Sequence, residues 1–184
     1  YLAQKSIPAM LAHTAGDIHP PGYYLLLHLW QAIAQPTVAH GLEFLYALPS
    51  LFFGVLLIAI LYPLGRKLFG HTSGLLAAWL TVIHPFHLWY SQEVRMYTLG
   101  ALLGLLCLWA LLKVCEIAPQ EATGRSRWLL LYVLCAAAGM YTLYYFVFLL
   151  LTLNLLALLL LRTQTKRLWG WIGAQCAAFL LWLP

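Results

Sequence analysis

Residues 42–64 read LEFLYALPSLFFGVLLIAILYPL, and Gly65-Arg66-Lys67 follow directly. Within this run the only charged side chain is Glu43, close to its start. About 20 consecutive apolar residues are enough for a helix to cross the roughly 30 Å hydrocarbon core of a lipid bilayer. The run therefore predicts a membrane-spanning helix that ends at a basic loop.

Further apolar runs follow the first one along the chain. They are Leu75 to Trp89, Tyr97 to Val114, Trp128 to Leu161, and Leu168 to Pro184. The run from Trp128 is too long for one span, and we expect it to fold into two near residues 139–142. Because the bilayer interior offers no water to backbone N–H and C=O groups, helices are the expected spanning structure. We predict an all-α, polytopic integral membrane helix bundle with about six transmembrane spans.

The segment before the first span is expected to lie along the membrane surface. Residues 22–35 are apolar, but a helix of this length reaches only about 21 Å. Tyr23, Tyr24 and Trp30 suit the depth of the membrane interface. We predict a single membrane domain over residues 1–184, with an outer loop and an outer-face interfacial helix in 1–41 and the spans in 42–184. Because the chain starts at Tyr rather than Met and stops within an apolar stretch, we expect it to be incomplete at both ends.

The composition supports this class of protein and argues against a water-soluble domain. Of the 184 residues, 64% are hydrophobic and 8% are charged, whereas soluble domains carry about a quarter charged residues. The net charge of +5 does not indicate nucleic-acid binding, because the basic residues cluster between apolar runs. These clusters are Arg66 and Lys67; Lys113, Arg125 and Arg127; and Arg162, Lys166 and Arg167. With alternating spans all three fall on one side, which the positive-inside rule places in the cytoplasm.

This orientation predicts that three segments share the outer face, namely residues 17–21, 84–97 and 141–146. In the first, Asp17 and His19 precede two prolines that start a helix. They are read either as a helix cap with an interfacial histidine or as part of a site. The third segment is rich in aromatic residues and is typical of an aromatic belt.

The second outer segment holds Gln92, Glu93, Arg95 and Tyr97 beside several aromatic rings. Glu93 and Arg95 are two residues apart, so they would not share one face of a helix. Ionisable groups at membrane depth are costly unless paired, and they indicate a functional site by default. The alternative interpretation is an aromatic belt with a local ion pair.

The motifs together resemble the bacterial GT-C glycosyltransferases, membrane transferases related to protein O-mannosyltransferases and to lipid A aminoarabinose transferases. The run DIHPPGYYLLLHLW at 17–30 is similar to their first outer loop. Further similar runs follow in the same order. They are LYPLGRKLFG at 61–70, HPFHLWYSQEVRMY at 84–97 and YTLYY at 141–145.

The resemblance implies a function. Such enzymes move a sugar from a polyprenyl-phosphate carrier to a hydroxyl on a protein, lipid or glycan, usually with inversion, at the outer face of the bacterial inner membrane. A carboxylate acts as base, and a fixed cation holds the phosphate. Arg95 is the cation that the outer segments supply, apart from Lys5. We expect Arg95, with Gln92 and Tyr97, to bind the donor phosphate.

The same resemblance implies roles for the carboxylates. Asp17 is the candidate catalytic residue within the chain, while His19 and Glu93 are candidates for the acceptor side or for a divalent metal site. Relatives carry their main base shortly after the first span, which lies upstream of Tyr1. We therefore expect the isolated chain to be inactive. Ala47 and Leu143 stand where relatives often have Arg and His.

The competing function is a transporter or flippase subunit that binds lipid-linked sugars without chemistry. Transporters place ionisable groups near the bilayer midplane, within broken helices. Here the spans 42–64 and 97–114 carry charge only near their ends. This pattern favours a site at the membrane surface and hence the enzyme.

Overall fold

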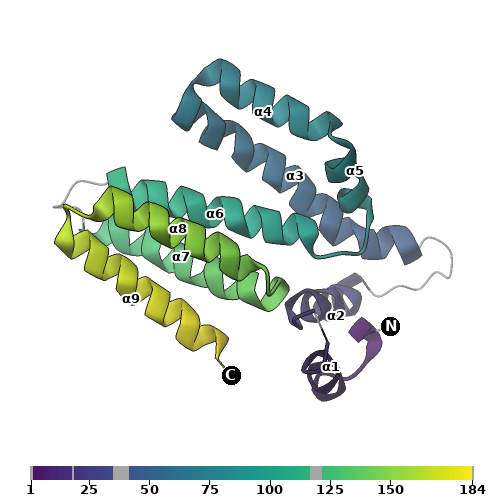
Figure 1. The fold of residues 1–184 in the computed structure, drawn as a ribbon. Helices are drawn as coiled ribbons and strands as arrows, with labels where there is room; N and C mark the ends of the chain where they lie inside the picture. Colours follow the sequence, from purple (N-terminus) through teal and green to yellow (C-terminus); the bar gives the residue numbers. More distant parts are fainter. Residues whose placement is uncertain (1, 18, 35–41, 117–121, 184) are drawn as a thin grey trace. The chain divides into compact units, whose positions relative to one another are not determined.

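The computed structural model describes residues 2–17, 19–34, 42–116 and 122–183, and all regular elements within these ranges are helices (Figure 1). The helices are η1 (Leu2–Gln4), α1 (Ile7–Thr14), α2 (Gly22–Ala34), α3 (Leu42–Phe69), α4 (His71–Ile83), α5 (Pro85–Gln92), α6 (Tyr97–Glu116), α7 (Ala122–Thr142), α8 (Phe146–Leu161) and α9 (Thr165–Trp182). The prediction of an all-α membrane helix bundle is confirmed.

Five of the six predicted spans each correspond to one helix, namely α3, α6, α7, α8 and α9, whereas the predicted span 75–89 contains parts of α4 and α5. Two stretches of the described residues, Glu43–Phe69 and Tyr97–Glu116, are long and apolar enough to cross a membrane by length and composition. Helices α4 and α8 are apolar but shorter. The number of crossings and the side of each loop stay predictions.

The expected run from Leu75 to Trp89 is not one helix, which corrects the sequence-based boundary. Helix α4 ends at Ile83, and α5 starts at Pro85. Between them His84 adopts an extended conformation, with φ −70° and ψ 123°. Proline has no N–H to continue the helical ladder, and its ring disfavours helical geometry at the residue before it. The segment 84–97 therefore begins with a helix of its own, α5.

The chain divides into two compact units, Tyr1–Leu102 and Leu103–Pro184. The prediction of a single membrane domain is not tested by this division. In the first unit α3 and α4 form an antiparallel hairpin around Gly70, whose φ of 92° suits glycine. A Cβ built on Gly74 would lie 2.6 Å from the Arg66 nitrogen. The absence of a side chain at this position lets the two helices pack backbone to backbone.

Helix α2 is attached to α3 at a break in the α3 hydrogen-bond ladder. Pro49 lies inside α3 and cannot donate to the Leu45 carbonyl four residues earlier. The indole Nε1 of Trp30 in α2 donates to that carbonyl instead, at 2.9 Å. The Leu45 carbonyl, which has no donor within α3, thus receives a hydrogen bond from α2. The same bond holds α2 against α3.

The second unit is a bundle whose interior polar groups are paired across helices. Trp171 Nε1 of α9 donates to Asn154 Oδ1 of α8 at 2.9 Å, and Gln175 Nε2 of α9 donates to the Tyr132 hydroxyl of α7 at 2.6 Å. Such pairing is expected of polar side chains inside a membrane bundle.

Basic residues of this unit that were expected between the apolar runs lie partly within helices. Arg125 and Arg127 lie inside the first turns of α7. Arg167 is buried in α9, and its Nη1 donates to the Cys115 carbonyl at 2.7 Å. The carbonyls of the last helical turn have no partner within the helix, and a guanidinium supplies one for α6.

Candidate functional site

Within the first unit, a chain of hydrogen bonds joins the first turn of α2, which follows residues 17–21, to the segment 84–97. The Tyr23 hydroxyl lies 2.6 Å from Ser50 Oγ, and Ser50 Oγ donates to the Arg95 carbonyl at 3.0 Å. A carbonyl can only accept, so the single Ser50 proton is used there and Tyr23 must donate to Ser50. Both side chains are buried, and burial raises the pKa of Tyr23, which keeps its proton in place.

The pKa of the next residue, Tyr24, responds to the charges near this chain of hydrogen bonds. Burial is the main cause that raises its pKa; the Asp17 carboxylate raises it further and the Arg95 guanidinium lowers it. The hydroxyl of Tyr24 therefore lies within electrostatic reach of both residues. Asp17 and Arg95 are far apart in the sequence, yet their charges act in opposite directions on the pKa of the Tyr24 hydroxyl.

Each of the two charged groups has a partner from its own segment. His19 Nδ1 lies 3.7 Å from Asp17 Oδ1, and Arg95 Nε lies 3.8 Å from Glu93 Oε2. The Arg95 side chain remains 51% exposed. Both separations are long for charge-assisted hydrogen bonds, which are typically 2.7–2.9 Å. The Arg95 guanidinium is therefore able to bind a further anion.

Glu93 and Arg95 pair although their spacing would not place them on one face of a helix, because neither residue lies in a helix. Helix α5 ends at Gln92, and Glu93 is extended, with φ −86° and ψ 144°. The Arg95 N–H then donates to the Glu93 carbonyl at 2.8 Å, which closes a tight turn around Val94. Outside a helix, residues two apart are able to face each other, and this turn brings the two charges together.

The remaining predicted residues are distributed around this turn. Gln92 is exposed at the end of α5, next to Ser91, which packs on Gly54 of α3. Tyr97 starts α6, and its ring centroid lies 4.5 Å from that of Tyr90. Among the described residues there is no group of three or more His, Cys, Asp or Glu side chains arranged to hold a metal ion. A divalent metal thus stays a prediction for His19, Glu93 and Asp17.

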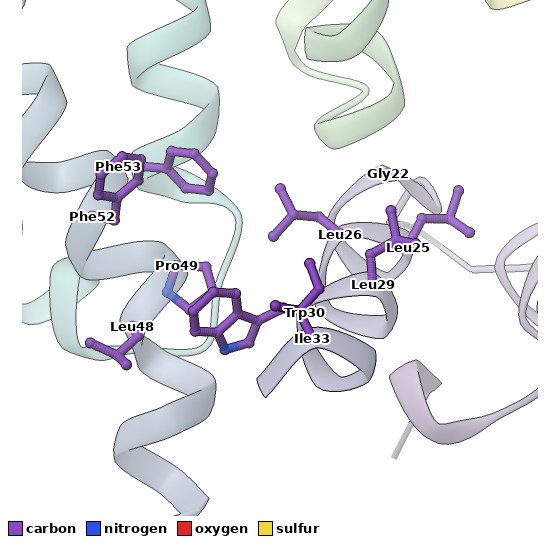
Figure 2. A pocket seen from close by; sticks show the side chains of 10 residues that line it. All are labelled: Gly22, Leu25, Leu26, Leu29, Trp30, Ile33, Leu48, Pro49, Phe52 and Phe53. Carbon is purple, nitrogen blue, oxygen red and sulfur yellow. The ribbon is translucent and has the colours of Figure 1, made fainter. Parts of the chain in front are cut away.

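An apolar groove of about 790 Å³ lies between α2 and α3 (Figure 2). The lining includes Leu25, Leu26 and Leu29 of α2 and Phe52 and Phe53 of α3. Figure 2 shows Leu26 pointing toward Phe53, with Trp30 beside Pro49. The groove thus lies between the two helices that carry Tyr23 and Ser50.

A second cavity of about 420 Å³ adjoins the groove and is more polar. It is lined by the start of α3 and the end of α5, including Glu43, Ser91 and Gln92. Leu48 lines both cavities, so they are neighbours across one side chain. Together they offer an apolar groove with a polar space beside it, which suits an amphiphilic ligand.

Sequence reasoning did not identify Ser50, Tyr23 or Glu43 as parts of this site. Ser50 is the most instructive, because a hydroxyl inside a long apolar run signals a hydrogen bond between helices. The third outer segment, residues 141–146, belongs to the second unit. There Thr142 donates to the Ala138 carbonyl of its own helix, and Tyr141 donates to the Leu181 and Trp182 carbonyls. Its predicted convergence with the other two segments stays a prediction.

Comparison with known proteins agrees with the motifs. No curated protein and no solved structure matches the chain. The model of one family, described as dolichyl-phosphate-mannose-protein mannosyltransferase, matches residues 18–184. The matched range starts one residue after Asp17 and includes His19, Ser50 and Arg95. It confirms the resemblance to membrane glycosyltransferases of the GT-C type. The chain belongs to the dolichyl-phosphate-mannose-protein mannosyltransferase family.

Proposed function

We propose that this membrane glycosyltransferase moves a sugar from a polyprenyl-phosphate donor to a hydroxyl of a protein, glycan or lipid at the outer face of a bacterial inner membrane. The observation that carries the proposal is the hydrogen-bonded chain from Tyr23 through Ser50 to the Arg95 carbonyl. It ties the segment with Asp17 and His19 to the segment with Glu93 and Arg95. A carboxylate and a guanidinium in one place are the groups that sugar transfer from a phosphate requires.

The chemistry assigns a part to each group. The bond between sugar C1 and the phosphate oxygen breaks, and its electron pair stays on the phosphate. The acceptor oxygen forms the new bond to C1 from the opposite face, which inverts the configuration, and its proton passes to a carboxylate base. Arg95, with Gln92 and Tyr97, stabilises the phosphate leaving group, because a guanidinium stays charged and offers a planar set of donors. Asp17 and His19 serve the acceptor side, and Glu93 orients the Arg95 segment.

The apolar groove supports a lipid donor over a soluble sugar nucleotide. Its lining is aliphatic and aromatic, and the adjoining cavity carries Gln92 and Glu43. An isoprenoid chain in the groove would leave its phosphate and sugar near the polar residues. Because lipid tails are as apolar as the groove, van der Waals packing of the chain rather than its removal from water contributes affinity, while the polar end fixes its direction.

The test is sugar transfer by the purified full-length enzyme in proteoliposomes, because the isolated chain is expected to be inactive. The donor is radiolabelled polyprenyl-phosphate mannose, chosen from the family description, and the other polyprenyl-phosphate sugars form a panel. Label that appears in a hydroxyl-bearing acceptor with inverted configuration supports the proposal. Movement of labelled lipid between leaflets without transfer to any acceptor would instead favour a flippase and would overturn it.

A further inference from the structure

A third cavity, of about 220 Å³, lies between α3, α5 and the first turn of α6. Aromatic rings from Phe86, Tyr90 and Tyr97 line it, together with the polar side chains of His87 and Thr98. The functional proposal above uses only Tyr97 among these residues. The cavity therefore combines ring faces with hydrogen-bonding groups in a place to which no role has been given.

Thr98 has an unusual position among the threonines of the chain. Its side chain is 3% exposed, and its hydroxyl has no hydrogen-bond partner among the described residues. Thr14, Thr81 and Thr142 each donate to the carbonyl four residues earlier in their own helices. Thr98 is the second residue of α6, so the carbonyl four residues earlier lies at Val94, in the turn before the helix. The usual partner is out of reach because the helix has only just begun.

An unpartnered buried hydroxyl is costly, and native proteins rarely keep one without a reason. Thr98 lines the cavity, so rotation about χ1 to another staggered position is able to direct the hydroxyl toward a ligand. A ligand with hydroxyl groups of its own would supply the missing partner.

The rings next to Thr98 set the shape of that ligand. The Tyr90 and Tyr97 centroids lie 4.5 Å apart with an interplanar angle of 54°, and Phe86 stacks on Tyr90 at 6.4 Å. Burial, and then the nearby His84, lower the pKa of His87, so near neutral pH its imidazole is uncharged. A neutral imidazole both donates and accepts, which matches a hydroxyl.

We propose that this cavity binds a monosaccharide ring, with Thr98 and His87 bonded to its hydroxyl groups and the rings of Tyr90 and Tyr97 against its C–H face. A pyranose has this pair of surfaces, with apolar C–H groups on its faces and hydroxyls at its edge. An acyl chain would leave Thr98 unpartnered, and a phosphate would find no cation among the lining residues. The proposal deepens the proposed function, because Tyr97 is two residues from Arg95 and the sugar would adjoin the phosphate contact.

Binding of simple sugars tests the site without requiring turnover. The probes are methyl α-D-mannopyranoside and the matching glucoside, galactoside and arabinoside, added to the purified enzyme in nanodiscs. We expect at least one to raise the thermal unfolding temperature and to bind in calorimetry. Thr98→Val keeps the side-chain shape and removes the hydroxyl, so binding should weaken about fivefold or more. The ligand-free unfolding temperature should stay equal or rise, because an unpartnered hydroxyl has been removed.

The controls separate a sugar site from a structural role. Thr98→Ser should retain most of the affinity, and Tyr90→Ala should lose it. Thr81→Val, which removes a hydroxyl bonded within α4, should leave glycoside binding unchanged. The proposal is overturned if no glycoside binds, or if Thr98→Val binds as well as the wild-type protein.

Kinetics then distinguish the two sources of the sugar. If Thr98→Val raises KM for the polyprenyl-phosphate sugar, the ring belongs to the donor; if it raises KM for a glycan acceptor, the ring belongs to the acceptor. Glycoside binding without transfer to any acceptor would leave this site standing while the proposed function fails. Sugar transfer by an enzyme that binds no glycoside in this cavity would leave the proposed function standing while this site fails.

Discussion

The hydroxyl of Ser50 donates a hydrogen bond to the backbone carbonyl of Arg95 at 3.0 Å, and it receives one from Tyr23 at 2.6 Å. One buried side chain in α3 thus fixes the backbone beside the cation and the helix that follows Asp17. The Arg95 side chain is exposed, but its main chain is anchored. An anchored main chain reduces the conformational freedom lost when the guanidinium binds an anion.

Removal of this anchor should affect both stability and turnover. Ser50→Ala deletes both hydrogen bonds and leaves the buried Tyr23 hydroxyl without a partner, so we expect a loss of about 1–3 kcal/mol in unfolding free energy. Tyr23→Phe removes one bond and should cost about 1 kcal/mol. Ser73→Ala, at a half-buried serine whose hydroxyl donates to the Phe69 carbonyl at the end of α3, is the matched control. Unfolding in denaturant and transfer kinetics provide the measurements, and equal behaviour of Ser50→Ala and Ser73→Ala would contradict the anchor.

Substitution of Arg95 tests the contact with the donor phosphate. Loss of a charge-assisted contact made mainly in the transition state costs on the order of 2–4 kcal/mol, or about 30- to 1000-fold in rate. We expect both Arg95→Ala and Arg95→Lys to reduce transfer by this range, because an ammonium cannot replace a planar guanidinium. Expression and membrane insertion should stay normal. Arg66→Ala, at the exposed far end of α3, should retain activity. Near wild-type turnover in both Arg95 variants would leave Arg95 as an interfacial anchor only.

The contact between Trp30 and the carbonyl that Pro49 leaves unpaired can be measured by a double-mutant cycle. Trp30→Phe should cost about 1–3 kcal/mol of stability, because it removes the only donor that α2 offers to the Leu45 carbonyl. Pro49→Ala restores a helical N–H at position 49. In that background Trp30→Phe should cost less, and the coupling energy should be about 1 kcal/mol. Additive losses would show that Trp30 acts by packing alone.

Obstruction of the apolar groove should discriminate between long and short lipid donors. Leu29 lines the groove and is 62% exposed, so Leu29→Trp fills the groove without overpacking the core. Because the displaced chain stays in lipid, the cost is lost packing, at about 0.1–0.2 kcal/mol per atom contact. Loss of on the order of ten contacts costs about 1–1.5 kcal/mol, which is roughly five- to tenfold in kcat/KM. The loss should be seen with a long polyprenyl donor and should disappear with a short, water-soluble one. Leu80→Trp, on the exposed face of α4, is the control. An equal loss with both donors would exclude the groove as the lipid site.

The sequence alone predicted the all-helical membrane class, the approximate positions of most of the long helices and the family. These features are local: an apolar run of 20 residues has few alternatives to a helix in lipid, and the motifs at 17–30 and 84–97 are contiguous. The break at Pro85 also has a local cause, because proline disfavours a helical residue before it. Even so, hydrophobicity alone predicts one helix over Leu75 to Trp89, because the hydrophobicity of a residue does not reflect that Pro85 lacks a backbone N–H.

Only the tertiary structure decided which polar groups meet. Ser50 in α3 and Thr98 in α6 are both hydroxyl residues within apolar runs, and their sequence surroundings do not identify their partners. The first lies between Tyr23 and the Arg95 carbonyl, whereas the second faces a cavity without a partner among the described residues. The same holds for Trp30, whose partner carbonyl is vacant because of a proline in another helix. Hydrogen bonds between helices depend on how the helices pack, and packing is a property of residues that are distant in the chain.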